Sequence, residues 1–171
     1  MVAERWRSVG PGGPWPWLIL GGSLLLSLAI YFGLLGSAWI DAVAAWTAQW
    51  LAATLNALGT PVRVDGTIVT SDRFVVDIVA ECTAVGPLVL YMGAVVAYPT
   101  RWRAKSSGLL LGLVVLTVVN LVRLVTLFWI GSAFPGYLGP AHLLVWQSLM
   151  ILLALLLWLY WLERAARARD V

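Results

Sequence analysis

Three side chains suited to acyl-transfer chemistry stand in largely apolar surroundings. The sequence has one cysteine, Cys82, one histidine, His142, and an arginine, Arg123, inside the apolar run VVLTVVNLVRLVTLFWIG. A thiolate attacks carbonyl carbon, an imidazole takes the thiol proton and returns it to a leaving amine, and a guanidinium stabilises an oxyanion. A nearby imidazole or guanidinium also lowers the pKa of a thiol. Together these residue types indicate acyl transfer through a thioester.

Each of these residues also has a structural interpretation. Cys82 could be a small core residue, His142 an interfacial polar residue at a helix start, and Arg123 a partner of Glu81 or of backbone carbonyls. Arg123 is the hardest to explain in this way, because a charge at the centre of a spanning helix costs roughly 2.5 to 3.5 kcal/mol. One cysteine and one histidine are too few for a disulfide or a zinc site, so we expect no metal and no cofactor.

The composition indicates an integral membrane protein. Of 171 residues, 61% are hydrophobic and only 11% are charged, against about a quarter in an average soluble domain. We expect one membrane domain, 1–171, of the all-α class, with no nucleic-acid module. A hydrocarbon core of about 30 Å takes roughly 20 helical residues to cross. The sequence thus predicts about four transmembrane helices, over 17–36, 83–98, 108–131 and 141–162.

The segment between the first two predicted spans has a different pattern. Over 38–58, tryptophans recur at helical spacing, which predicts an amphipathic helix lying in the membrane interface. Over 62–80, polar and apolar residues alternate around the turn signals DG and TSDR, which predicts a small β-hairpin. The presence of two turn signals leaves the register of this hairpin open.

The basic residues predict the orientation in the membrane. Positive residues are retained on the cytoplasmic side, and eight of the eleven Lys and Arg residues fall on one side only if both termini are cytoplasmic. These eight are Arg5, Arg7, Arg101, Arg103, Lys105, Arg164, Arg167 and Arg169. A cleaved signal peptide at the N-terminus is an alternative that leaves the remaining topology unchanged. In this topology Cys82 and His142 lie at the extracytoplasmic face, and Arg123 lies roughly 12 Å below it.

At these residues the sequence resembles the exosortase/archaeosortase family, which are membrane-embedded cysteine transpeptidases. The family pattern has a Cys at the head of one span, an Arg often preceded by an Asn in a later span, and a His at the head of the next. Here the matching stretches are AECTAVG with Cys82, VVNLVRLV with Asn120 and Arg123, and GPAHLLVW with His142. The chain is short for the family, many of whose members carry more spans before the Cys.

The resemblance implies a function and its partners. Family substrates are secreted proteins with a C-terminal sorting signal, made of a short motif, a transmembrane helix and a basic tail. The resemblance implies a thiol protease or transpeptidase of the inner cell membrane, with Cys82, Arg123 and His142 as catalytic residues. Asn120 and Glu81 would orient Arg123, His142 or the substrate. The alternative is a non-enzymatic assembly or transporter subunit in which Arg123 has a structural role.

Overall fold

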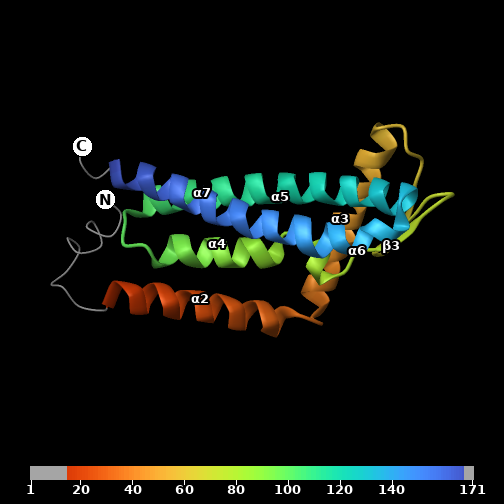
Figure 1. Cartoon of the computed structure of the whole chain (residues 1–171). Helices are drawn as coiled ribbons and strands as arrows, with labels where there is room; N and C mark the ends of the chain where they lie inside the picture. Colours follow the sequence, from red (N-terminus) through yellow and green to blue (C-terminus); the bar gives the residue numbers. More distant parts are fainter. Residues whose placement is uncertain (1–14, 168–171) are drawn as a thin grey trace.

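The computed structural model describes residues 15–167, and side chains are described for 18–165. Three of the basic residues that predict the orientation in the membrane lie outside the described residues: Arg5, Arg7 and Arg169. Four of the described helices run side by side along a bundle (Figure 1). They are α2 (Trp15–Leu34), α4 (Val85–Ala97), α5 (Trp102–Ala133) and α7 (Gln147–Arg167). The helix α3 (Ala38–Ala57) crosses one end of this bundle, and we call that end the sheet end because it also carries the strands (Figure 1).

The described helices differ in their capacity to span a bilayer. The helices Trp102–Ala133 and Pro135–Ala165 are each long and apolar enough to cross a membrane. Leu18–Leu34 and Ala38–Ala57 pass the same test only as a pair, bent by 84°. The 13 residues of α4 extend about 20 Å, less than a hydrocarbon core of about 30 Å. The protein is a mostly helical membrane protein, and the predicted count of four spans is not confirmed.

The turn into α3 is set by two residues. Gly36 has a φ of 74°, a left-handed conformation that glycine adopts without a Cβ clash. Ser37 is the N-cap residue, and its Oγ accepts a hydrogen bond from the Ile40 N–H at 3.4 Å. The segment predicted as an interfacial helix thus forms α3. Its small and aliphatic residues face the protein, and its tryptophans are 54 to 69% exposed: Trp39, Trp46 and Trp50.

The segment predicted as a hairpin forms a three-stranded antiparallel sheet in the order β1-β2-β3. Its strands are β1 (Arg63–Asp65), β2 (Ile68–Thr70) and β3 (Val75–Asp77). Both turn signals reverse the chain: Gly66 in the first has a φ of 60°, and in the second the Ser71 Oγ accepts from the Phe74 N–H at 3.1 Å. The predicted hairpin is therefore incomplete by one strand. Val69, fully buried in the central strand, packs against the cluster under α3.

Short helical segments join the larger elements at the sheet end. The 3-10 turn η1 (Ala80–Cys82) precedes α4, and Pro87 lies in the first turn of α4, where a backbone N–H has no helical partner. After α5 come η2 (Pro135–Tyr137), α6 (Leu138–Pro140) and the π-helix η3 (Ala141–Trp146). These segments continue into α7, so the last helix begins before the start predicted at 141. Likewise α5 begins at Trp102, earlier than the predicted 108.

Glycines permit close contact between the helices of the bundle. A Cβ on Gly112 would collide with the ring of Tyr91, which is 2% exposed and whose hydroxyl donates to the Gly108 carbonyl at 3.0 Å. At Gly93 a Cβ would collide with Ser27 of α2, and the Ser23 Oγ donates to the Gly93 carbonyl at 2.7 Å. Thus α5 contacts α4 at Gly112, and α2 contacts α4 at Gly93.

We predict that Gly112→Ala destabilises the protein. The added methyl group displaces the anchored Tyr91 ring, and overpacking of this kind costs typically about 1 to 3 kcal/mol. Thermal unfolding in detergent measures the loss. The control is Gly33→Ala, also within a helix but with no atom within 4 Å of the added Cβ, which should unfold at or above the wild-type temperature. Equal behaviour of the two variants would contradict this packing.

Candidate active site

Arg123 lies in α5, ten residues before the helix ends at Ala133, and so about 15 Å from the sheet end of that helix. Its side chain is 1% exposed. Its Nη1 donates to Asn120 Oδ1 at 3.4 Å, and its Nη2 donates to the Glu81 carbonyl at 3.2 Å. The same Nη2 lies 2.8 Å from His142 Nε2. Arg123 therefore joins η1, α5 and the π-helix η3.

Asn120 completes the link between α5 and η1. It is 3% exposed, and its Nδ2 donates to the carbonyl of Cys82 at 2.9 Å while its Oδ1 accepts from Arg123. The Cys82 N–H in turn donates to the Val79 carbonyl at 2.9 Å. The backbone of Cys82 is therefore held on both sides. The spacing of Asn120 and Arg123, one helical turn apart on one face, allows this joint contact.

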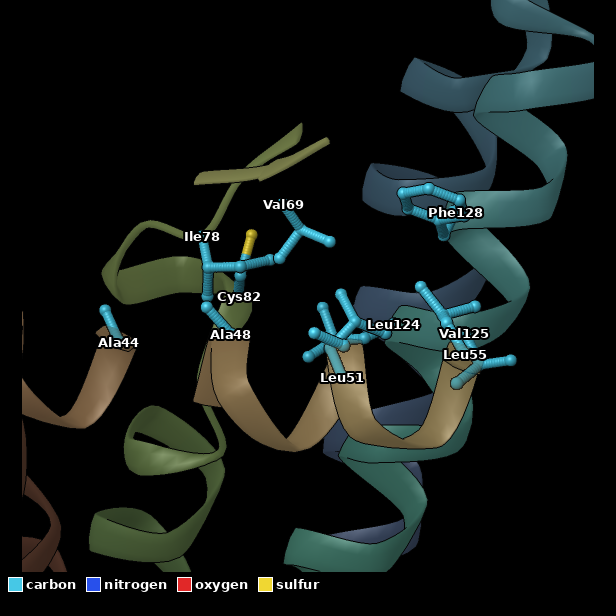
Figure 2. Close-up of a cluster of buried hydrophobic side chains, with 11 residues drawn as sticks. Ala44, Ala48, Leu51, Leu55, Val69, Ile78, Cys82, Leu124, Val125 and Phe128 are labelled. Carbon is cyan, nitrogen blue, oxygen red and sulfur yellow. The ribbon is translucent and has the colours of Figure 1, made fainter. Parts of the chain in front are cut away.

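The thiol of Cys82 lies in an apolar cluster under α3 and the sheet. Cys82 is 9% exposed and belongs to the cluster formed with Ala48, Leu51, Val69 and Ile78, among others. Figure 2 shows its sulfur directed toward Val69. The contacts that join the candidate residues thus involve the backbone carbonyl of Cys82, and its side chain has no hydrogen bond to Arg123 or His142 among the described contacts.

Burial raises the pKa of the Cys82 thiol above its ordinary value. A backbone hydrogen bond with Val79 and the positive charge of Arg123 lower this pKa, and the negative charges of Glu81 and Asp77 raise it, but burial is the largest effect. The thiol is accordingly protonated at neutral pH in this conformation. As expected of a neighbouring cation, Arg123 lowers the pKa of the thiol. Burial of the thiol in the apolar cluster raises this pKa by more.

Glu81 lies beside the site, but its carboxylate takes no part in the contacts. The residue is exposed, and it is its backbone carbonyl that accepts from Arg123. Within the described residues Arg123 has no ion pair with any carboxylate, so an Arg123–Glu81 charge pair is absent from this conformation. The interpretation of Arg123 as a partner of backbone carbonyls does agree with its geometry. A structural role of Arg123 and a catalytic one therefore predict different effects of replacing the Cys82 thiol.

A cavity of about 660 Å³ opens between α2, α4 and α7 and reaches the site. Its walls are mostly apolar, and it follows α7 from Gln147 to Trp158, roughly 16 Å. Polar residues gather at its sheet end: Tyr31, Glu81, Thr83, Arg123 and Gln147. Sequence reasoning had not selected Thr83 or Gln147. Two features of the sequence could have identified them: Thr83 is a polar residue next to Cys82, and Gln147 is a polar residue in the apolar run after His142.

The arrangement supplies groups that suit acyl transfer. Within the described residues no three His, Cys, Asp or Glu side chains come together as a metal site would require. The buried guanidinium of Arg123 lines the end of an apolar cavity and contacts the imidazole of His142 and the turn that carries Cys82. Among the described residues the buried Nε of Arg123 has no hydrogen-bond partner, so one donor of the guanidinium is unused. Such a donor suits an oxygen that arrives with a ligand.

We predict that the reaction of Cys82 with methyl methanethiosulfonate, which forms a methyl disulfide on the thiol and releases methanesulfinate, is slow at neutral pH and accelerates as the pH rises toward the raised thiol pKa. The variant Glu81→Gln removes a charge that raises this pKa, so at a fixed pH below it the rate should increase. The control is Asp41→Asn, an exposed carboxylate that does not shift the thiol pKa and should leave the rate unchanged. The single cysteine makes the mass-spectrometric readout unambiguous. Rapid disulfide formation at pH 6 would contradict the described environment of the thiol.

Comparison with known families gives one match that covers most of the chain. The family model for transmembrane exosortase (Exosortase_EpsH) matches residues 12–160, which include every candidate site residue. Comparison with curated proteins and with solved structures gave no match. The match extends well beyond the three motifs from which the resemblance was drawn, and it shows that the chain belongs to the transmembrane exosortase family.

Proposed function

We propose that this protein is a membrane cysteine transpeptidase or endopeptidase that cleaves the C-terminal sorting signals of secreted proteins. Cleavage occurs at the extracytoplasmic face of the inner membrane, through a thioester on Cys82. Family membership supports the reaction class. The single observation that carries the assignment to these residues is the buried Arg123, which contacts His142 and the backbone of Glu81 and has no counter-anion in the part of the chain that the structure describes.

An uncompensated buried cation favours an anion that arrives with the reaction. A buried charge without a partner costs several kcal/mol, and such residues in membrane proteins mark functional sites by default. Arg123 has only neutral hydrogen-bond partners in the described contacts, and its Nε has none. A thiolate or a tetrahedral oxyanion would supply the missing negative charge. The buried charge of Arg123 is unfavourable in the resting protein, and it stabilises the anion that forms during the reaction.

The cavity supports a substrate that is partly a transmembrane helix. Its apolar walls lie along the bundle, and its polar residues lie at the sheet end beside Cys82 and Arg123. A helix lying in this cavity would carry its first residues outside the membrane to the level of the candidate nucleophile. The basic residues Arg101, Arg103 and Lys105 lie at the opposite end of the bundle, which would face the cytoplasm together with both termini.

The proposed reaction has two stages. The Cys82 thiol loses its proton to His142, and sulfur attacks the carbonyl carbon of the scissile peptide, giving an oxyanion held by Arg123. The C–N bond then breaks, His142 returns the proton to the leaving amine, and a thioester remains on Cys82. An amine of an acceptor, or water, attacks the thioester and restores the thiol. Because the thiol is covered in the resting conformation, substrate binding has to move it toward His142.

Removal of the thiol tests the proposal directly. We expect Cys82→Ala to abolish processing of a co-expressed secreted protein that carries a motif, a transmembrane helix and a basic tail, while Arg123→Met or His142→Ala lowers it by about 10² or more. Immunoblotting of the substrate follows the mass change on cleavage. Asp41→Asn is the matched surface control and should process normally, and all variants must reach wild-type levels in the membrane. Undiminished processing by Cys82→Ala would instead favour the structural role of Arg123.

The cavity can be tested with two neighbouring leucines of α7. Leu155 lines the cavity and Leu156 does not, yet they are 50% and 53% exposed. We expect Leu155→Trp to lower processing by about 10-fold, because a displaced substrate helix no longer presents its peptide bond correctly. Leu156→Trp should change it by less than about 2-fold, as a surface substitution does. Equal effects of the two variants would exclude the cavity as the site of the substrate helix.

A further inference from the structure

The contact between Arg123 and His142 restricts the protonation of the imidazole. Arg123 Nη2 lies 2.8 Å from His142 Nε2. A guanidinium carries five N–H donors, has no acceptor, and keeps its proton in proteins. The hydrogen bond can therefore form only if Nε2 carries a lone pair. A neutral imidazole with an unprotonated Nε2 has its proton on Nδ1.

Arg123 is held independently of His142, so the arginine determines the contact. Its Nη2 has two hydrogens, and its two partners are the Glu81 carbonyl at 3.2 Å and His142 Nε2. Its Nη1 donates to Asn120, whose other amide atom holds the Cys82 carbonyl. These contacts place the guanidinium against η1 and α5. His142 approaches it from the π-helix Ala141–Trp146, a helix type that is frequent at functional sites.

We propose that Arg123 is a positioning residue for His142: it selects the Nδ1–H form of the imidazole and keeps Nε2 unprotonated until substrate arrives. The catalytic meaning of this assignment rests on the proposed function. Nε2 is then the nitrogen that accepts the thiol proton, but Arg123 occupies its lone pair in the resting protein. The scissile carbonyl of a bound substrate accepts from the unused Nε of Arg123, and the guanidinium then moves away from His142 and releases Nε2.

The proton balance of this sequence closes on the described residues and the substrate. When the carbonyl oxygen takes the Arg123 N–H, His142 Nε2 accepts the proton of the Cys82 thiol and the imidazole becomes a cation. The S–C bond forms, and the electron pair of the C=O bond moves to the oxygen beside Arg123. As the C–N bond breaks, Nε2 gives its proton to the departing amine. The imidazole returns to the neutral Nδ1–H form and can again accept from Arg123.

The single histidine allows a direct spectroscopic test on the full-length chain. Protein labelled with ¹⁵N-histidine, purified through a tag without histidine, should give one unprotonated nitrogen assigned to Nε2 and one protonated nitrogen assigned to Nδ1. In Arg123→Met the spectrum should shift to the Nε2–H form that free histidine side chains favour. Arg103→Met, an exposed arginine of the same helix, is the matched control and should keep the wild-type spectrum. An Nε2–H form in the wild type, or an Nδ1–H form that persists in Arg123→Met, would overturn the assignment.

A second measurement needs only the wild-type protein, so it tests the proposal even if Arg123→Met does not fold. In wild-type protein labelled at both arginine and histidine nitrogens, a scalar coupling across the hydrogen bond should join Arg123 Nη2 to His142 Nε2, and its absence would reject the proposal. The outcome is independent of processing. The expected tautomer in a protein that fails to process would refute the proposed function alone. Normal processing by a protein with the other tautomer would refute this inference alone.

Discussion

The site depends on a buried guanidinium that has no counter-ion among residues 15–167. Arg123 is 1% exposed, and its hydrogen bonds go to an amide oxygen, a backbone carbonyl and an imidazole nitrogen. These partners come from α5, η1 and η3, so satisfying the guanidinium also brings together the segments that carry the candidate nucleophile and base. Dipolar partners reduce the cost of burying the charge but do not neutralise it. The positive charge of Arg123 therefore favours an anion beside it, and the thiolate and the oxyanion of an acyl transfer would each be such an anion.

The same arrangement separates the thiol of Cys82, the candidate nucleophile, from Arg123 and His142. The backbone of Cys82 is bound to Asn120, while its side chain lies in the apolar cluster under α3 and the sheet. Burial there raises the thiol pKa despite the charge of Arg123. A protonated, covered thiol is protected from oxidation and from reaction with unintended carbonyls. In the proposed enzyme, reactivity would therefore follow the binding of a substrate and its displacement of His142 from Arg123.

The bundle gives the cavity two different walls. Helices α4, α5 and α7 all pack against one another, whereas α2 packs mainly against α4 through the close approach of Ser27 to Gly93. The space left between α2 and α7 forms the cavity, which is lined by apolar residues of both helices. In the proposed enzyme, this is the space that a substrate helix would occupy.

The sequence by itself determined the residue types of the site, the helical membrane class and most helix positions, because these follow from composition and from apolar runs of spanning length. It did not determine the third strand, since two turn signals in a short segment leave the pairing open. It also left open whether Arg123 would pair with the Glu81 carboxylate or bind backbone carbonyls, and whether the Cys82 thiol would lie in the core or beside His142. Side-chain direction and hydrogen-bond partners depend on how separate segments pack, and only the tertiary structure decided them.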